Sequence, residues 1–379
     1  MEARRQNQIR ALVKRMNTRS AVAMAAAVMV AAVAVGPGAG SAVAAGVQPY
    51  AITDLGTLGT TTVSYGINAS AQIVGRSYLQ QTVPGDHCTL HHPNCRVTVY
   101  HAFRYGAGRI TNLGTLGGTF SDARAVNGNG DVAGSSTLSG TSLSPAFAFL
   151  YSNGQMKNLG TLGGSSSRAY GINDFGEVVG DSNRASGAAD AFLYSGGKMT
   201  DLGALGSLGS SANDINNVHQ VVGDSEVADG SGEHAFLWSN GTMKDIGTLG
   251  GSQSIAYAIN DGGQIVGYST PANHSAHAFL YSGGKMTDLG VFFDSSVGEA
   301  INSSGVVVGQ ADVLNKDGTT QYHAFIYSGG ALRDLNTLIP AGSGFVLTEA
   351  IGINDTGQIV CNGYNPTNGQ THAFLLNPS

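Results

Sequence analysis

Nine side chains with charged, phenol or amide groups occupy two recurring positions of this sequence, three and five residues before the Asn of a repeated Ile/Val-Asn step. They are Tyr65, Asp122, Arg124, Arg168, Tyr170, Asn213, Tyr257, Glu299 and Glu349. Tyrosine faces stack on sugar rings, while Asp, Arg and Asn groups hydrogen-bond hydroxyls. Paired carboxylates about 5–10 Å apart can instead cleave a glycosidic bond by acid/base chemistry. The residue types therefore indicate glycan contact, either for binding or for cleavage.

These two positions vary from copy to copy, whereas their neighbours do not. Six residues before the Asn lies Ser or Thr in every copy, and four before it lies a small residue. A ligand at the axis of a repeat ring is asymmetric, so residues that contact it should differ between copies, while shared residues are structural. Alternation along a strand puts the two variable positions on one side. The loop before the Ala-Phe step also changes length between copies, and we expect ligand contact at that rim and at the mouth of the central channel.

The sequence leaves several activities open. Asp122, Glu299 and Glu349 are the candidate acids of a hydrolase, and a tyrosine of the set beside one of its arginines is the candidate base of a lyase. No G-x-S-x-G, kinase or zincin motif is present. A binding scaffold for a glycan or a protein is therefore the first hypothesis, a carbohydrate-active hydrolase or lyase the second, and a purely structural wall component the third.

Seven copies of a repeat position these side chains, and the Phe of its Ala-Phe step recurs every 43 to 49 residues. The repeated Asn is Asn68, Asn127, Asn173, Asn216, Asn260, Asn302 and Asn354. The Phe of the Ala-Phe step is Phe103, Phe149, Phe192, Phe236, Phe279, Phe325 and Phe374. One copy reads as four strands, at 167–173, 177–182, 190–195 and 198–203, with a two-residue Gly-Gly hairpin turn between the last two. An all-β repeat of this period is typical of propeller blades.

The two ends of the chain complement each other. The last copy stops at "HAFLLNPS" and lacks a fourth strand, while "YAITDLG" at 50–56 matches "KMTDLG" at 198–203 and precedes every copy. Docking this segment on the last blade would cover two sheet edges. We therefore predict an all-β, seven-bladed β-propeller over residues 46–379, with four antiparallel strands per blade and the N-terminal strand completing the last blade.

The triplet His-Ala-Phe recurs at His101, His234, His277, His323 and His372, whereas Phe147 and Asp190 replace the His in two copies. With its repeat period and the phrase "DLGTLGG", the chain resembles the bacterial extracellular HAF-repeat proteins over nearly all of residues 46–379. The resemblance implies export and a repeat architecture, and it implies no reaction. We expect each His to satisfy a backbone group in its own blade.

Residues 1–45 have the pattern of a secretory signal peptide: a basic head, an Ala/Val-rich run at 21–35 and the small residues "AVA" at 42–44. A retained membrane anchor is the alternative, but the run is short for a span of about 20 residues. Cleavage would leave 13 basic and 24 acidic residues, a formal charge of −11. Such a chain repels phosphate backbones. We expect an extracellular protein with polysaccharide or cell-surface protein partners, no nucleic acid and no remaining membrane span.

Two of the three cysteines, Cys88 and Cys95, lie in one insert, "HCTLHHPNC". A local disulfide is expected in an exported chain. A zinc site that also uses the histidines of the insert is the alternative, but the spacing matches no structural zinc pattern. We therefore predict no metal and no cofactor. Cys361 replaces the glycine that closes "VVG" in other copies, and we expect a buried small residue there rather than a nucleophile.

Overall fold

The computed structural model describes residues 49–84, 94–138, 145–272 and 274–379. The described chain is almost wholly β, with 28 strands and one short 3-10 helix, η1 (Leu335–Thr337). The all-β prediction is therefore confirmed. Apart from the turn 315–319, in which Thr319 donates from its backbone N–H and its hydroxyl to Asp317, the described residues belong to one compact unit. This unit is described below.

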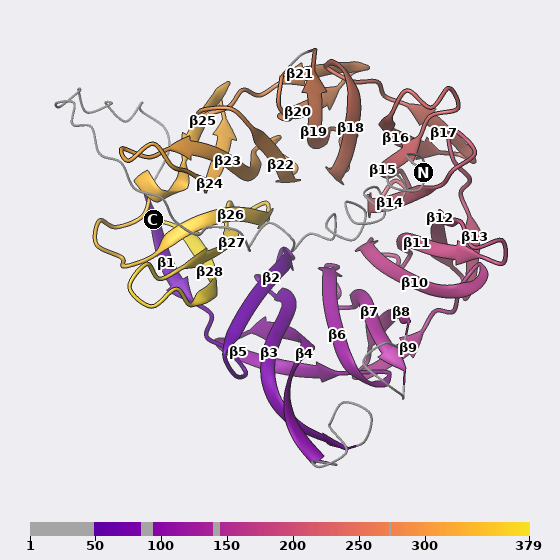
Figure 1. Ribbon diagram of the computed structural model, residues 1–379, viewed down its shortest axis with the longest axis horizontal. Helices are drawn as coiled ribbons and strands as arrows, with labels where there is room; N and C mark the ends of the chain where they lie inside the picture. Colours follow the sequence, from indigo (N-terminus) through magenta and orange to yellow (C-terminus); the bar gives the residue numbers. More distant parts are fainter. Residues whose placement is uncertain (1–48, 85–93, 139–144, 273) are drawn as a thin grey trace, which may run out of the picture. The chain divides into compact units, whose positions relative to one another are not determined.

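Strand pairing divides the unit into seven antiparallel modules of four strands (Figure 1). Module 1 is β2 (Thr61–Ile67), β3 (Ile73–Pro84), β4 (Asn94–Gly106) and β5 (Arg109–Gly114). Module 2 is β6 (Gly117–Val126), β7 (Val132–Leu138), β8 (Ala146–Ser152) and β9 (Gln155–Asn158). Module 3 is β10 (Gly163–Ile172), β11 (Val178–Arg184), β12 (Ala189–Ser195) and β13 (Lys198–Asp201). Module 4 is β14 (Ser210–Ile215), β15 (Val221–Glu226), β16 (Glu233–Ser239) and β17 (Thr242–Asp245).

Modules 5 to 7 follow the same order. Module 5 is β18 (Gly250–Ile259), β19 (Ile265–Pro271), β20 (His277–Ser282) and β21 (Lys285–Asp288). Module 6 is β22 (Ser296–Ile301), β23 (Val307–Leu314), β24 (Thr320–Ser328) and β25 (Ala331–Asp334). Module 7 is β26 (Val346–Ile353), β27 (Ile359–Tyr364), β28 (Thr371–Pro378) and β1 (Tyr50–Asp54). Single parallel pairings, Tyr100 with Phe120 and Glu233 with Gln253, join modules 1 and 2 and modules 4 and 5 into eight-stranded sheets.

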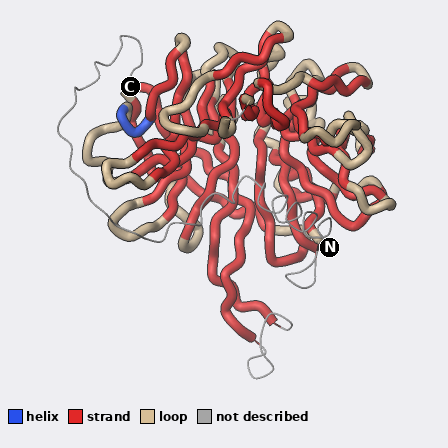
Figure 2. Tube along the Cα trace, turned by 45° about the horizontal axis from the view of Figure 1, so that its top comes forward, coloured by secondary structure: helices blue, strands red, loops and turns tan. Residues whose placement is uncertain are grey.

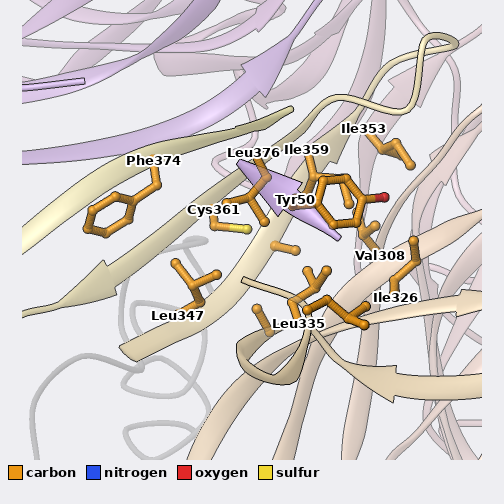
Figure 3. Packing of buried hydrophobic residues seen from close by; sticks show 13 residues of the cluster. Tyr50, Val308, Ile326, Leu335, Leu347, Ile353, Ile359, Cys361, Phe374 and Leu376 are labelled. Carbon is orange, nitrogen blue, oxygen red and sulfur yellow. The ribbon is translucent and has the colours of Figure 1, made fainter. Parts of the chain in front are cut away.

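The first strand of the described chain completes module 7. β1 pairs antiparallel with β28, and Ile52 stands opposite Leu376, which is the pairing that "YAITDLG" predicts. Figure 3 shows Tyr50 of β1 packed among the apolar side chains of this module, including Leu376 and Cys361. Cys361 is fully buried, as predicted, and burial raises the pKa of its thiol well above the usual value. The thiol is therefore a core group and not a reactive thiolate.

The first strands of the modules lie innermost in Figure 1, and each contacts the first strand of the next module, including β26 with β2. The repeated Asn at the end of each first strand connects the modules. Its Nδ2 donates to the backbone oxygen of the Asn in the next module at 2.8–3.3 Å, and Asn354 donates to Asn68, so seven bonds return to their starting point. The Asn Oδ1 accepts backbone N–H groups of its own turn, as in Asn68 with Ser70 and Gln72, which is the local role expected of Asn.

The Ser that stands six residues before the Asn in five copies connects neighbouring modules. Ser167 of β10 donates to the oxygen of Gly160, in the connector from the preceding module, at 2.6 Å, and it accepts the N–H of Ala148, in β8 of that module, at 2.9 Å. The same two bonds occur at Ser121, Ser210, Ser254 and Ser296. The repeated hydroxyl is therefore structural, because it bonds backbone groups that would otherwise lack partners.

Close packing explains the Gly that six copies share and the Phe that all seven share. The seven Phe side chains of the Ala-Phe step are fully buried. A Cβ on Gly75 would lie 2.1 Å from the oxygen of Val63 and 2.8 Å from the ring of Phe103. Only glycine fits between the first strand and the Phe ring at this place. Figure 2 shows one departure from the repeat, the hairpin of β3 and β4, which extends beyond the other strands.

Candidate functional site

A β-bulge displays the variable residue three positions before each Asn. In module 2 the register between β6 and β7 shifts between Ala123 and Ala125, so Arg124 is the extra residue. The seven extra residues are Tyr65, Arg124, Tyr170, Asn213, Tyr257, Glu299 and Ile351. A bulge re-aims one side chain and leaves it outside the ladder. The backbone therefore presents one chosen side chain per module at the same place.

The variable residue five positions before the Asn stands opposite a second variable series that the sequence analysis missed. These are the residues that follow the "VVG" glycine on the second strand: Arg76, Ser135, Asp181, Asp224, Tyr268, Gln310 and Asn362. Asp122 stands opposite Ser135, for example, and Arg168 opposite Asp181. The signal was available, because this position also varies beside an almost invariant glycine.

Modules 1 to 3 bring together what we call the cationic cluster: Tyr65, Arg76, Tyr100, Asp122, Arg124, Ser135, Arg168, Tyr170 and Asp181. At its centre Arg124 donates from Nε and Nη2 to Oδ2 of Asp122, at 2.8 and 2.6 Å. Ser135 donates to Oδ1 of the same carboxylate at 2.8 Å. Tyr65, Asp122 and Arg124 are 2%, 7% and 4% exposed. The ion pair is therefore buried, and both oxygens of its carboxylate already accept hydrogen bonds.

Aromatic rings hold the guanidinium groups of the cluster. The guanidinium of Arg124 lies 4.2 Å from the centre of the Tyr65 ring, and that of Arg76 lies 5.8 Å from the same ring. Arg76 also lies 4.9 Å from the Tyr100 ring centre. Contacts of this kind contribute about 0.5–2 kcal/mol, more when the cation is desolvated. Two arginines and two tyrosines thus fix one another in a preformed arrangement.

The ionisation of the cluster is set by its buried charges. Burial alone would raise the pKa of Asp122, but Arg124, the Ser135 hydroxyl and Arg76 outweigh burial and lower it. Burial raises the pKa of Tyr170, and the nearby carboxylate of Asp181 raises it further. Asp122 is therefore held as a carboxylate and Tyr170 as a neutral phenol.

The cluster contains more hydrogen-bond donors than acceptors. Nη1 of Arg124 and Nε of Arg76 are buried and make no hydrogen bond with any described residue. A buried donor without an acceptor costs about 1–3 kcal/mol, and more when it is charged. Three guanidinium groups face two carboxylates, those of Asp122 and Asp181. The cluster is thus one negative charge short of balance.

Modules 4 to 6 place acidic and neutral groups at the same positions, in what we call the acidic cluster: Asn213, Asp224, Glu233, Tyr257, Tyr268 and Glu299. Nδ2 of Asn213 donates to Asp224 at 3.1 Å, and the rings of Tyr257 and Tyr268 are 6.0 Å apart. Burial raises the pKa of the Tyr268 phenol, and the charges of Asp224, Glu233 and Glu299 raise it further. This cluster contains three carboxylates and no basic residue.

Glu349, the last of the nine predicted site residues, lies at the junction of modules 7 and 1. Its Oε1 accepts a hydrogen bond from Nδ2 of Asn362 at 2.8 Å. Oδ1 of Asn362 accepts both the backbone N–H and the hydroxyl of Ser64, each at 2.9 Å. Five of the nine residues therefore lie in the cationic cluster, three in the acidic cluster, and Glu349 takes part in a structural junction. Ligand contact by all nine stays a prediction.

A second candidate region lies at the C-terminal ends of the first strands and was not predicted. A cavity of about 260 Å³ is lined by the repeated asparagines of modules 1 to 4 and by Asp174, Asn217 and Asp261. These side chains bond each other and the backbone: Asn217 donates from Nδ2 to Asp174 at 3.1 Å and to Asp261 at 3.2 Å. The sequence signal was the variable residue directly after each repeated Asn. Its polar groups are satisfied within the chain, which favours a structural role.

The histidines of the His-Ala-Phe triplet do not bond the backbone, so that expectation is wrong. Nδ1 of His234, His277, His323 and His372 lies 2.6–2.7 Å from the carboxylate of Asp245, Asp288, Asp334 and Asp54, respectively. The same carboxylate accepts the N–H of a following residue, as Asp288 does from Gly290. In module 1 the partner of His101 is Asn112, at 3.0 Å. The triplet therefore closes an outer turn and is structural.

The predicted Cys88–Cys95 disulfide and the alternative zinc site lie on a segment whose side chains are outside the described residues. Among the described residues, no group of three or more His, Cys, Asp or Glu side chains is arranged to hold a metal ion. The described chain also contains no helix long and apolar enough to cross a membrane.

Residues 242–373, about a third of the chain, match the family described as "Protein of unknown function (DUF3466)". No curated protein matches the sequence. Among solved structures, a mutant of AofleA from Arthrobotrys oligospora is 10% identical, with a TM-score of 0.37, and the match covers 88% of this chain and 94% of that one. A mutant of the Aleuria aurantia lectin, in complex with Fucalpha1-6GlcNAc, is 14% identical, with a TM-score of 0.35 and coverage of 76% and 100%.

The acylaminoacyl peptidase of Pyrococcus horikoshii is 10% identical to the chain, with a TM-score of 0.49, and the match covers 83% of this chain and 51% of that one. Likenesses at these identities and TM-scores assign no fold class or role to the chain, whose all-β architecture follows from its own strand pairing.

Proposed function

We propose that the chain is an exported, closed seven-bladed β-propeller that binds glycans through the rim and channel mouth formed by its first strands. Closure is supported by the seven Asn bonds that return from Asn354 to Asn68 and by the pairing of β1 with β28. Contact between β26 and β2 adds to this. A closed ring covers the sheet edges that an open array would expose, and each module is then one blade.

One observation carries the glycan assignment: the variable positions of modules 1 to 3 gather tyrosine rings and charged hydrogen-bonding groups in one cluster. Tyr65, buried against Arg124, and the half-buried Tyr100 supply aromatic rings, while Arg124 and Asp122 are fixed by each other and by Ser135. Sugar recognition needs this combination, because one face of a pyranose is apolar and its rim carries hydroxyls. A preformed cluster also loses little side-chain entropy on binding.

The pKa directions favour binding over proton transfer. A hydrolase needs one carboxyl group whose pKa is raised so that it can act as an acid, but the pKa of Asp122 is lowered. A lyase base among the tyrosines needs a lowered pKa, and that of Tyr170 is raised. The carbohydrate-active enzyme remains the second candidate through Glu299, which lies by Tyr268 and two other carboxylates.

Export belongs to the same proposal. Residues 1–45 would be a cleaved signal peptide, residues 46–379 the propeller, and the chain an extracellular member of the HAF-repeat proteins with a Cys88–Cys95 disulfide. The support is in the sequence: the basic head, the Ala/Val-rich run and the charge of −11 that cleavage would leave. The partner would be a polysaccharide or a glycan-bearing cell-surface protein, and not a nucleic acid.

A thermal-shift screen of the chain without residues 1–45 against neutral and acidic polysaccharides and oligosaccharides tests the function. Binding at 100 times Kd stabilises the fold by about 2.7 kcal/mol, so a ligand gives a clear rise in Tm. Tyr170→Phe removes one phenol oxygen of the cluster, while Tyr151→Phe is a matched change at a partly buried tyrosine of β8. The first variant is expected to weaken binding, the second to leave it unchanged.

The outcomes of this screen separate the candidates. A stabilising ligand that stays intact in a reducing-end assay supports the binding scaffold. New reducing ends would favour the hydrolase or lyase. If no saccharide raises Tm, the chain is not a glycan-binding protein, and a protein partner or a structural role takes its place.

A further inference from the structure

The cationic cluster has the chemistry of an anion site, and the inference that follows rests on the proposed glycan-binding function. Arg124 directs Nε and Nη2 to one oxygen of Asp122, whose other oxygen accepts from Ser135. Nη1 of Arg124 takes no part in the bonds to Asp122, and it makes no hydrogen bond with the described residues. Arg76 has a second buried donor without an acceptor, its Nε.

We propose that this cluster binds the carboxylate of an acidic glycan, such as a uronic-acid residue. Guanidinium groups are suited to this role because they donate planar, paired hydrogen bonds to carboxylates and keep their charge. A carboxylate between Arg124 and Arg76 would supply the missing acceptors and the missing negative charge together. A neutral sugar supplies acceptors alone.

The tyrosines of the cluster extend the argument from an anion to an acidic sugar. The Tyr65 ring lies within 6 Å of both guanidinium groups, and Tyr100 packs against Arg76 and, at 4.8 Å between ring centres, against Phe120. An inorganic anion gains nothing from aromatic faces, whereas a sugar ring stacks on them. The combination fits a ligand with a charged group on an amphipathic ring.

Arg168 is the part of the cluster that a ligand meets first. It is exposed, whereas Arg124 is buried, and it interacts with Tyr170 and Asp181. Since Nη1 of Arg124 is covered in the unliganded chain, binding requires rotation of side chains at the mouth, a change that is common in binding sites. The exposed positive charge would attract an anionic ligand before this rotation.

The acidic cluster of modules 4 to 6 disfavours binding of an acidic sugar at the equivalent positions. Their carboxylates, Asp224, Glu233 and Glu299, act together on Tyr268, and the acidic cluster contains no basic residue. An anionic sugar is repelled by this cluster and attracted by the cationic one. The ligand is therefore oriented, with its acidic group toward modules 1 to 3.

Isothermal titration at low salt tests the proposal with three probes: an oligosaccharide of galacturonic acid, its fully methyl-esterified form, and sodium sulfate. Wild type should bind the acid form at least ten-fold more tightly than the ester, and sulfate only weakly. Arg168→Gln removes an exposed charge without disturbing the buried pair. Arg124→Lys keeps the partner of Asp122 and removes the planar donor. Both are expected to weaken binding of the acid form at least ten-fold, and Arg109→Gln, at an exposed arginine of β5, should leave it unchanged.

Each other outcome is decisive. Equal binding of acid and ester would overturn the carboxylate site and leave glycan binding intact. Sulfate binding as tight as the acid form, and lost in Arg124→Lys, would mean a site for small anions and not for an acidic sugar. Acid binding that survives both cluster variants would place the site elsewhere. If neither saccharide nor any other glycan binds, the proposed function itself fails.

Discussion

Modules 1 to 3 and modules 4 to 6 have the same backbone arrangement but place side chains of opposite charge at equivalent positions. The same bulge presents Arg124 in module 2 and Glu299 in module 6. The same second-strand position holds Arg76 in module 1 and Asp224 in module 4. In the first region Arg124 and Asp122 form a buried ion pair beside aromatic rings, whereas in the second carboxylates gather around Tyr268. The comparison shows that the repeat fixes where a side chain points and leaves its chemistry free.

The pair that closes the outer turn also differs between modules 1 to 3 and modules 4 to 7. In modules 4 to 7 each triplet His pairs with an Asp carboxylate, as His277 does with Asp288. In modules 1 to 3 the pair is altered: His101 faces Asn112, Phe147 replaces the His, and Asp190 pairs with Arg184 at 2.8 Å. Two independent positions have thus diverged in the same half of the chain, which indicates that this half is under different constraints.

The largest expected difference between the two regions is in the free energy of unfolding. Asp122→Ala leaves the guanidinium of Arg124 buried without its partner, and losing one member of a buried ion pair costs about 3–5 kcal/mol. The matched change Asp224→Ala removes one of three clustered carboxylates, so lost hydrogen bonding is offset by reduced repulsion, and we expect about 1 kcal/mol or less. Urea unfolding of both variants checks this. Equal losses would contradict the contrast between the clusters.

The pH dependence of the Asp122 contribution follows from the direction of its pKa. The folded-state pKa is lowered from 3.8, so the carboxylate contributes stability that is fully present above about pH 4 and is lost as the pH falls through the lower folded-state value. The stability difference between wild type and Asp122→Ala should therefore be constant from pH 5 to 8 and shrink only in stronger acid.

The next largest expected effect on the free energy of unfolding comes from the His pairs of the outer turns. Partly exposed pairs of this kind contribute about 1 kcal/mol or less. Burial lowers the pKa of His101, although its bond to Asn112 opposes this. The folded state thus disfavours the protonated ring, and stability falls as the pH drops below the unfolded value of about 6.5. Asn112→Asp supplies the carboxylate found in modules 4 to 7 and should reduce this loss. Unfolding free energies at pH 7 and pH 5 measure it.

The reverse exchange is the control for that experiment. Asp288→Asn converts the module 5 pair of His277 into the module 1 type, and it retains an oxygen for the N–H of Gly290. We expect a loss of stability where Asn112→Asp brings a gain. Two changes of the same sign would show that the local packing, and not the charge of the pair, distinguishes the halves.

Sequence comparison of the copies could locate much of this arrangement. The repeated Asn and Phe, the Gly-Gly turns and the match of "YAITDLG" to a fourth strand all follow from residues that recur with a fixed spacing. Gly196 and Gly197, for instance, have φ of 58° and 85°, as their hairpin turn requires. The Gly-Gly pair can be recognised as a turn in the sequence because few other residues tolerate positive φ.

The parts that could not be predicted depend on register. No residue type marks the bulge at Arg124, because the same position holds Tyr, Asn, Glu or Ile in other modules. The bulge therefore could not be predicted from the sequence. The partner of His277 lies 11 residues away on the adjacent strand, so the pair is visible only when the pairing is known. Charge clustering across modules likewise needs the spatial order of the strands, since Arg76 and Arg124 lie in different copies.

Removing a charge from the acidic cluster tests the contrast between the two clusters through ligand affinity. Glu299→Gln removes one negative charge from the half that repels an anionic ligand, so binding of the galacturonic acid oligosaccharide should tighten by about two- to five-fold at low salt. The gain should vanish near 0.5 M salt, where charges are screened beyond about 4–5 Å. Titration at both salt concentrations checks this. A gain that survives high salt would indicate direct contact with residue 299 instead of a field effect.

The smallest expected effect concerns the turn between the third and fourth strands, which differs between modules 1 and 5. Module 5 uses Gly283 and Gly284, with φ of 59° and 85°, whereas module 1 uses Ala107 and Gly108, with φ of 51° and 75°. A Cβ in this left-handed region costs about 1–2 kcal/mol, of which the greater freedom of glycine in the unfolded chain offsets roughly half. Ala107→Gly should therefore stabilise the fold by about 0.5 kcal/mol, and Gly283→Ala should destabilise it by a similar amount. Paired urea unfolding curves measure both, and since neither residue contacts a charged cluster, glycan affinity should stay constant; a change in affinity would mean that the strength of this hairpin is coupled to the site.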